Sequence, residues 1–536
     1  MISASFFERH PLTRGVLFLY NEGIHSTKKE NRNVKKPMLR ALLLLLALLT
    51  VIPLAACQEA PTPQETDPVT DPVETDPATD PATDPETDPE TDPTEGPVLP
   101  TVHYGNSEFV ILTRAQTEHL EAIWVASVTE KSSSLHRAVY QRLKNIGYKY
   151  GIAFDARIES PSNLVATNVK AGQDVFDLVC DHGNTQFSNA MNGYFYDWND
   201  LPYVDLSADW WSREAVREFT TAGGKFFTGF GDIGYMSVGS GGCIFFNKTL
   251  LGEVQGLESP YALVDRNEWT FDRFEEYVIT MDSNMDGDNT GNLNTDVFGY
   301  VTGNYLGTSH YFHATGYRVL TRKNGEWRIT IDNDTTNSAA FDMRELVLDS
   351  GAVGFMNDFD YSPTRKVFMD GRTAFVSALV NDAIFFAESD VRYGILPFPK
   401  YTSRVKGYPT IVSAGTGLYT VMRNTSAENA ERISIVLEEL AYDGYKTIMP
   451  LYYDVVLSYQ VLQDEDSLRM LQLIHDNLIL DVGAFLGLPD NVIYTAASDA
   501  SSASLSQLYG EIESQALEKL GTWCDLDELW EVMGQS

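Results

Sequence analysis

Residues 101–536 predict an α/β fold with largely parallel sheets. Short apolar runs alternate with amphipathic helical patterns along this segment, and such alternation is typical of βαβ units. The segment is long enough for two ordinary domains, and its many Tyr, Phe and Trp residues predict a sizeable core. Residues 1–100 differ in composition and are expected to lie outside this fold.

The predicted elements begin with a buried strand over 108–114 (EFVILTR). A helix over 132–150 follows, because four apolar residues recur at helical spacing: Leu135, Val139, Leu143 and Ile146. Further apolar runs predict strands over 173–183, 241–251, 298–304, 372–379, 393–399 and 418–422. Helices are predicted over 269–281, with Thr270 as its cap, and over 427–449, where Ile433, Val436, Leu437 and Leu440 share a face.

The leucine-rich run over residues 38–56 has the order of a signal peptide. Lys35, Lys36 and Arg40 precede its apolar part, and small residues end it. Its apolar stretch, residues 41–56, is shorter than the roughly 20 residues of a membrane-spanning helix. Residues 1–37 are too long for the basic start of a signal, so Met38 is the expected start and 1–37 an upstream extension.

The end of this run, Leu-Ala-Ala-Cys57, resembles the bacterial lipobox. The resemblance implies cleavage before Cys57, a lipid on its sulfur, and a protein anchored at the extracellular face of the cell membrane. A diacyl anchor suffices for stable attachment. The alternative is an uncleaved signal anchor in which the cysteine is incidental.

Residues 58–100 predict a disordered stalk that follows the lipidated cysteine. They contain seven Thr-Asp-Pro triplets, thirteen acidic residues and no Lys, Arg or aromatic residue. Proline removes backbone donors and like charges repel, so the segment is expected to stay extended and solvated. Residues 57–100 therefore predict a tether for a globular domain.

The charge and the cysteines of residues 101–536 exclude two classes of protein. The whole chain has a net charge of −36; the stalk contributes thirteen negative charges and residues 1–56 a net +5, which leaves about −28. Nucleic-acid binding is not expected, because it depends on Lys and Arg replacing counterions. The three cysteines in this segment, Cys180, Cys243 and Cys524, are an odd number, so no disulfide framework is expected.

Eight stretches, in a characteristic order, resemble the extracellular solute-binding proteins of ATP-driven importers, within the large carbohydrate-binding group. They include GGKFFTGFGDI, IFFNKTLL, EWTFDRFEEY, YGILPFPKY and VLEELAYDGYKTIMPLYYDVVL, and the likeness spans nearly all of 105–490. The resemblance implies a type II periplasmic-binding-protein fold: two lobes, each a mixed sheet flanked by helices, joined by crossing hinge segments. The expected first lobe comprises about 101–235 and 401–450, and the second about 236–400 and 451–536.

The same resemblance implies a function. It predicts a monomeric, non-enzymatic receptor that needs no cofactor, captures a sugar or oligosaccharide, and delivers it to a separate permease with its ATPase. The chain itself has no P-loop. A surface glycan-binding adhesin or a glycoside hydrolase remain alternatives, because a hydrolase's paired carboxylates are set by spatial position and not by sequence.

Ligand-binding candidates come from the carboxyl ends of predicted strands, where α/β sheets bind ligands. His182 lies at the end of one predicted strand, and Asp382 lies after another. The candidates for ligand contact are Asp181, Asn184, Ser240, Asn304, Tyr305 and Asn381. The aromatic series Tyr194, Tyr196, Trp198, Tyr203, Trp210 and Trp211 could also stack sugar rings, although core packing is the alternative.

Residues 282–296 resemble an EF-hand-like calcium loop. Asp282, Asn284, Asp286 and Asp288 occupy ligand positions, with Gly287 at the turn. The twelfth position is Leu293 where an EF-hand has Glu, so Asp296 could close the site only through a bulged loop. The segment is therefore interpreted either as a structural Ca²⁺ site or as an Asx-rich surface turn. Two catalytic motifs are rejected: His310 and His313 lack a metalloprotease Glu, and Ser240 lacks the preceding Gly of a nucleophile elbow.

Overall fold

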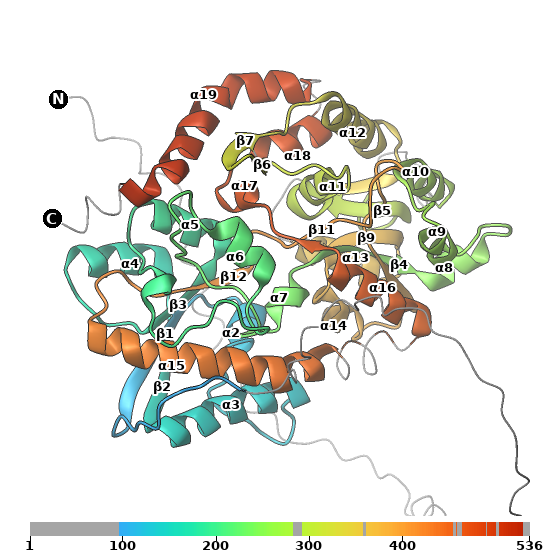
Figure 1. Ribbon diagram of the computed structural model, residues 1–536. Helices are drawn as coiled ribbons and strands as arrows, with labels where there is room; N and C mark the ends of the chain where they lie inside the picture. Colours follow the sequence, from blue (N-terminus) through green and yellow to red (C-terminus); the bar gives the residue numbers. More distant parts are fainter. Residues whose placement is uncertain are drawn as a thin grey trace, which may run out of the picture. The chain divides into compact units, whose positions relative to one another are not determined.

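The structure, a computed structural model, describes residues 96–281, 292–356, 361–453, 457, 462, 464–488, 490–499 and 503–528. All described residues belong to one compact unit, Thr91–Ser536, which contains two main sheets (Figure 1). The sequence predictions for Cys57 and for Asp282, Asn284, Asp286 and Asp288 lie outside the described residues.

The first sheet has the strand order β12-β3-β1-β2. Its strands are β1 (Ser107–Thr113), β2 (Ile152–Ile158), β3 (Leu178–His182) and β12 (Gly417–Thr420). β1 pairs in parallel with β2 and β3, whereas β12 is antiparallel to β3. Helices α3 (Ser134–Tyr150) and α4 (Pro161–Lys170) pack with this sheet, and α15 (Ala427–Asp443) packs on α3. The region around this sheet is called the first lobe.

The second sheet has the order β10-β4-β9-β5-β8. Its strands are β4 (Gly242–Asn247), β5 (Phe298–Gly303), β8 (Val353–Met356), β9 (Thr373–Leu379) and β10 (Tyr393–Leu396). β5 is parallel to β8 and β9, whereas β4 is antiparallel to β9 and β10. Helices α10 (Phe271–Thr280), α13 (Ser362–Met369) and α16 (Glu465–Asp476) pack with its strands. This is the second lobe. Both sheets are mixed, as the resemblance implied, but the second has two parallel and two antiparallel pairs, so the expectation of largely parallel sheets is wrong for it.

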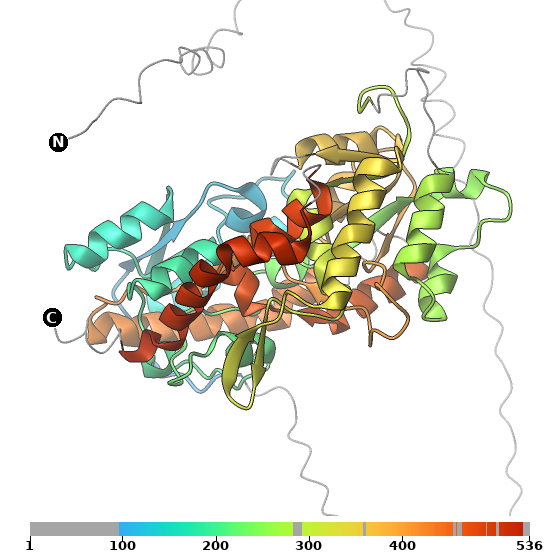
Figure 2. The ribbon, with the colours of Figure 1, turned by 90° about the horizontal axis from the view of Figure 1, so that it is seen from above.

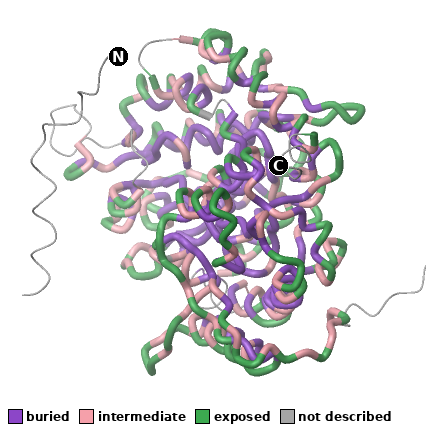
Figure 3. Tube along the Cα trace, turned by 90° about the vertical axis from the view of Figure 1, so that its left-hand side faces the viewer, coloured by how far each residue is buried: buried purple, intermediate pink, exposed green. Residues whose placement is uncertain are grey.

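Two large hydrophobic cores pack against the sheets, and buried residues fill the interior in Figure 3. The first contains Phe109 and Ile111 of β1, and the second contains Phe245 of β4 and Phe375 of β9. The Tyr408 hydroxyl donates to the Val264 carbonyl oxygen at 3.4 Å, so the chain stays with the second lobe beyond residue 401.

The C-terminal helices contact both lobes. Helix α18 (Asp490–Ser498) packs on α12 (Asp334–Arg344) of the second lobe. Helix α19 (Leu505–Cys524) lies beside α12 and the hairpin of β6 (Leu320–Lys323) and β7 (Glu326–Ile329) in Figure 2. Near its end, Trp523 contacts Phe187 of α5 (Gly183–Met191) in the first lobe, with ring centroids 5.2 Å apart. The sequence placed this segment in the second lobe; in the structure it joins the two.

The predicted helices are confirmed, with one local correction. All the apolar residues predicted to share faces on α3 and α15 are buried. Thr270 is the N-cap of α10, but its side chain makes no capping hydrogen bond. Cys180, Cys243 and Cys524 are free thiols. Across the described ranges, no helix has both the length and the apolar character needed to cross a membrane.

Candidate functional site

Three crossing segments join the lobes: residues 239–242, 410–416 and 477–481. The first two pair at Gly241 and Val412, and the second and third pair as β11 (Thr410–Ile411) and β13 (Leu478–Ile479). The Ser413 amide also donates to the Ser240 carbonyl oxygen at 2.9 Å. The crossing segments therefore form one hydrogen-bonded strip, and residues 413–416, called the crossing loop, carry the chain back into the first lobe.

Arg114 follows β1 directly and points to the crossing loop. Its Nη2 donates to the Gly415 carbonyl oxygen at 2.8 Å, and its Nη1 lies 3.9 Å from Oδ1 of Asp181. The residue is only 7% exposed, and its Nε and Nη1 have no hydrogen-bond partner among the described residues. Burial lowers the pKa of Arg114, and the nearby Cys180 and then Asp181 oppose that shift.

Asp181 is the penultimate residue of β3 and is itself buried. Its Oδ1 accepts the His182 amide at 2.8 Å and lies 3.4 Å from Nδ1 of that imidazole. The His182 side chain is 45% exposed and is the accessible part of this edge. His119 is buried nearby with its Nδ1 unpartnered within the described chain; burial, followed by the charge of Arg114, lowers its pKa well below the usual value.

The facing edge belongs to the second lobe and begins with a π-helix. β5 leads into η2 (Asn304–Ser309), and π-helical turns occur often at functional sites. The Ala414 amide of the crossing loop donates to Oη of Tyr305 at 2.8 Å. The Tyr305 ring lies 5.1 Å from the imidazole of His310, centroid to centroid. This edge therefore touches the same four-residue loop that Arg114 holds from the other lobe.

His310 is a buried, neutral imidazole. Neither ring nitrogen has a hydrogen-bond partner among the described residues, and burial, aided by His313, lowers its pKa to about 3. The ring sits against Gly242, where a Cβ atom would collide with Nδ1. The hydroxyl oxygens of Ser240 and Ser309 are buried and unpartnered within the same described residues. An unmet buried polar group costs about 1–3 kcal/mol, so these groups gather where a polar ligand would be stabilised.

The predicted ligand residues fall into three groups. The crossing loop is contacted by Tyr305, by the Asn184 amide, which donates to the Ala414 carbonyl oxygen at 3.2 Å, and by the Ser240 carbonyl. Asp181 reaches it only through Arg114. Buried Asn304 and Asn381 are turned to other neighbours: their Oδ1 atoms accept the hydroxyls of Ser498 and Tyr452, each at 3.2 Å. Whether any of these residues binds a ligand remains a prediction.

Sequence reasoning missed three residues of this site: Arg114, His119 and His310. The signal for Arg114 was present, because Arg114 and Asp181 both lie at the carboxyl end of a buried strand. His310 was considered only as a metal ligand. In the structure Nε2 of His313 instead donates to Oδ2 of Asp481 at 3.0 Å, and the described residues hold no group of three His, Cys, Asp or Glu placed for a metal.

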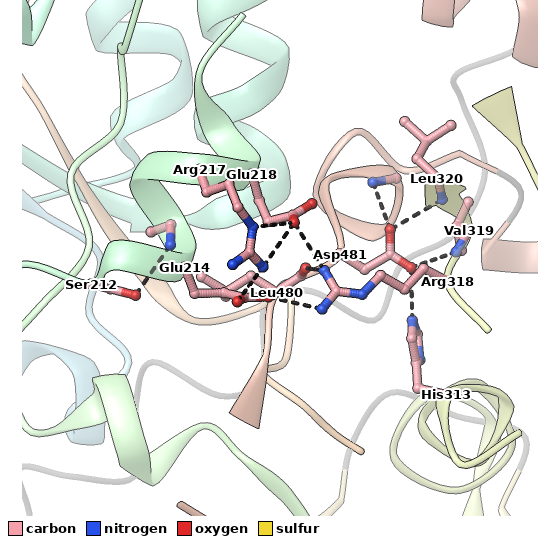
Figure 4. A network of polar contacts seen from close by, with 12 residues as sticks. Ser212, Glu214, Arg217, Glu218, His313, Arg318, Val319, Leu320, Leu480 and Asp481 are labelled. Carbon is pink, nitrogen blue, oxygen red and sulfur yellow. Dashed lines mark hydrogen bonds and ion pairs between the residues drawn. The ribbon is translucent and has the colours of Figure 1, made fainter. Parts of the chain in front are cut away.

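A second polar network links the lobes beside the crossing segments (Figure 4). Arg318 contacts Glu214 and Glu218 of α6 (Arg213–Phe219) in the first lobe at 2.9 and 3.2 Å, and donates to the Leu480 carbonyl oxygen at 2.8 Å. Buried Asp481 accepts three backbone amides nearby, those of Val319, Leu320 and Gly483. This network fixes the third crossing segment to both lobes.

The aromatic series belongs mainly to the core. Trp198 and Trp211 are at most 2% exposed and Trp210 is 9% exposed, so the idea that these three stack sugar rings is wrong. The carboxylate of Glu438 accepts the indole N–H groups of Trp210 and Trp211, each at 2.9 Å. Burial raises the pKa of Glu438 to about 7. These two hydrogen bonds explain why the adjacent residues Trp210 and Trp211 both point into the core.

Comparison with known proteins gives solved structures only. No protein-family model and no curated protein matches the chain. A maltose/maltodextrin-binding domain of MalE from Bdellovibrio bacteriovorus, bound to maltotriose, is 14% identical with a TM-score of 0.53, over 77% of this chain and 99% of that one. UgpB from Mycobacterium tuberculosis, in complex with glycerophosphocholine, is 15% identical with a TM-score of 0.53, over 78% and 99%.

A solute-binding protein of an ABC transporter from Thermotoga lettingae, bound to α-D-tagatose, gives 13% identity and a TM-score of 0.53, over 77% and 100% of the two chains. At such identities the likeness concerns the fold alone. The chain has the two-lobed type II periplasmic-binding-protein fold, and that prediction is confirmed.

Proposed function

We propose that this protein is a cell-surface receptor that captures a solute between its lobes and delivers it to an ABC permease. The observation that carries the proposal is the crossing loop. Side chains from both facing sheet edges meet it, and several buried polar groups beside it lack partners within the described residues. Ligands of open α/β sheets bind at such carboxyl edges.

The ligand is proposed to be polyhydroxylated, with sugars and oligosaccharides first. The structural neighbours described above were solved with maltotriose, tagatose and glycerophosphocholine, which share hydroxyl groups. The unpartnered N–H groups of Arg114 can donate hydrogen bonds to hydroxyl oxygens of the ligand. The neutral imidazoles of His119 and His310 can donate to or accept from its hydroxyl groups in a site without water. Whether the ligand is a single sugar or a chain is the first question for experiment.

The chain is proposed to act without catalysis and from a lipid anchor at Cys57, on the extracellular face of the membrane. A receptor in a cell without an outer membrane needs such a tether to stay near its permease. The lipobox supports this placement, and the solute-binding neighbours support the non-enzymatic role. Mass spectrometry of the native protein tests the anchor: an unmodified peptide spanning Ala56 and Cys57 would contradict it.

A thermal-shift screen tests the function. The full chain is incubated with mono- and oligosaccharides and with glycerophosphocholine, and each compound that shifts the melting temperature is titrated by calorimetry. A ligand at 100 times its dissociation constant should stabilise the protein by about 2.7 kcal/mol. Recovery of the compound unchanged after hours supports a receptor. Its hydrolysis would favour a glycoside hydrolase, and binding only to polymeric glycans would favour an adhesin.

A further inference from the structure

The first sheet has an open edge at β2. Among the described strands, β2 pairs only with β1, and it is the last strand of the order β12-β3-β1-β2. Asp155, Arg157 and Ile158 are exposed along it, Ile158 to 44%. Sheet edges present unpaired backbone groups, and proteins usually protect them with proline, lysine, bulges or covering segments. Residues 152–158 contain neither proline nor lysine.

The direction of the backbone groups follows from one hydrogen bond. The Glu159 amide, at the end of β2, donates to the Thr113 carbonyl oxygen of β1 at 3.1 Å. Peptide groups alternate in direction along a strand, so the amides and carbonyls of Phe154, Ala156 and Ile158 face away from β1. These groups form a regular edge that another strand can continue.

The sequence of this edge, IAFDARI, is complementary to itself. If two copies pair in antiparallel fashion about Ala156, Asp155 of each copy lies opposite Arg157 of the other. Phe154 lies opposite Ile158 in the same arrangement, on the other face of the ribbon. Within one chain, Arg157 meets Glu159 only at 3.9 Å, and both side chains are more than half exposed. Opposite charges and apolar pairs placed directly across a sheet are stabilising.

Hollows flank both faces of β2. On one face a cavity of about 420 Å³ is lined by Phe154 together with Trp124 and Tyr148, and Tyr148 is 91% exposed. On the other face a hollow of about 590 Å³ is lined by Arg157 and by Val175, which is 44% exposed. Exposed apolar side chains beside a free strand edge mark an interaction surface.

We propose that the β2 edge binds a second copy of this chain in antiparallel register about Ala156, in place of the monomer that the resemblance implied. The pairing joins the two first sheets into one continuous sheet. The residues specify a second copy as the partner, because in antiparallel pairing Asp155 of each copy lies opposite Arg157 of the other. The proposal is independent of which solute the protein binds, since β2 lies at the sheet edge and not at the crossing loop.

Disulfide trapping tests the register. In a backbone-paired antiparallel position, Cα atoms lie about 5.5 Å apart, within the range of about 4.4–6.8 Å that a disulfide spans. Ala156→Cys in the full chain, oxidised in membranes of expressing cells, should therefore give a reducible dimer on a denaturing gel. Leu517→Cys, at a position 51% exposed on α19, is the matched control. The parent chain measures the background of its natural cysteines.

Charge exchange tests the pairing itself. In the Ala156→Cys chain, Asp155→Arg alone or Arg157→Asp alone places like charges opposite each other, twice in the dimer, and should lower the cross-linked fraction about tenfold. The double exchange should restore it. Unchanged thermal unfolding of the exposed-site variants confirms that they are folded. A cross-link at Ala156→Cys no stronger than at Leu517→Cys, or one indifferent to the single reversals, overturns the proposal.

Discussion

Replacing Arg114 with methionine removes the guanidinium while keeping most of the side chain's length and apolar volume. In the empty protein two effects oppose each other. The charged hydrogen bond to Gly415 is lost, at about 1.5–3 kcal/mol, but a buried cation whose Nε and Nη1 lack described partners is also removed. We therefore expect the melting temperature of the empty protein to change little.

Ligand binding should respond differently. If the free donors of Arg114 meet a hydroxyl oxygen, the variant loses a charge-assisted hydrogen bond worth about 1.5–3 kcal/mol. That corresponds to a loss of about one to two decades in affinity. Titration calorimetry with a compound identified by the thermal-shift screen gives the affinity, and scanning calorimetry gives the melting temperature.

Arg142→Met is the matched control. Arg142 is a buried arginine of the same lobe, 1% exposed, and its guanidinium donates to the carbonyl oxygens of Ile233, Leu440 and Ala122. Its replacement should lower the melting temperature by removing bonds internal to the first lobe, while the folded protein binds as before. If Arg114→Met instead keeps full affinity and loses stability as Arg142→Met does, Arg114 is a structural residue and the assignment of the site is wrong.

Further predictions concern the same regions. Asp181→Ala should weaken binding at least tenfold, by loss of the carboxylate beside the guanidinium; calorimetry showing unchanged affinity with a lower melting point would contradict this. Burial raises the pKa of Glu438 and Asp232 to about 7, so the folded protein binds these protons more tightly than the unfolded chain. The free energy of unfolding should thus be highest below about pH 4 and fall as pH rises through 7, by about 3 kcal/mol for Glu438; urea titrations across pH 4–8 check the sign, and Glu438→Gln should flatten the curve. Gly242→Ala should collide with the His310 ring and lower the melting temperature, whereas the same change at open, helical Gly510 should not.

Much of the fold followed from periodicity. Helices α3 and α15 bury one face each, and their apolar residues recur at the spacing that a helix requires. β2 escaped detection because IAFDARI lies at a sheet edge, where alternate residues face solvent and the run is not continuously apolar. The β6–β7 hairpin was missed too, although Asn324 and Gly325, both at positive φ, are a typical turn signal.

The site was harder to predict because it is assembled from distant segments. The rule of strand ends led to Asp181 and Tyr305, which the structure places near one loop. The same rule could not reveal that Arg114 would hold that loop, since the contact joins residues 301 positions apart. Nor could sequence spacing distinguish tryptophans that face a cleft from those that Glu438 holds in the core.

The central claim is capture of a solute by movement of the two lobes about the crossing segments. Pulsed electron resonance measures it directly, with spin labels at Tyr148→Cys on α3 of the first lobe and Phe341→Cys on α12 of the second, in a Cys524→Ser background. Both label sites are exposed, Tyr148 to 91% and Phe341 to 50%. Addition of a compound that raises the melting temperature should replace a broad distance distribution with a narrower one of different mean. A distribution unchanged by a saturating ligand would contradict the account.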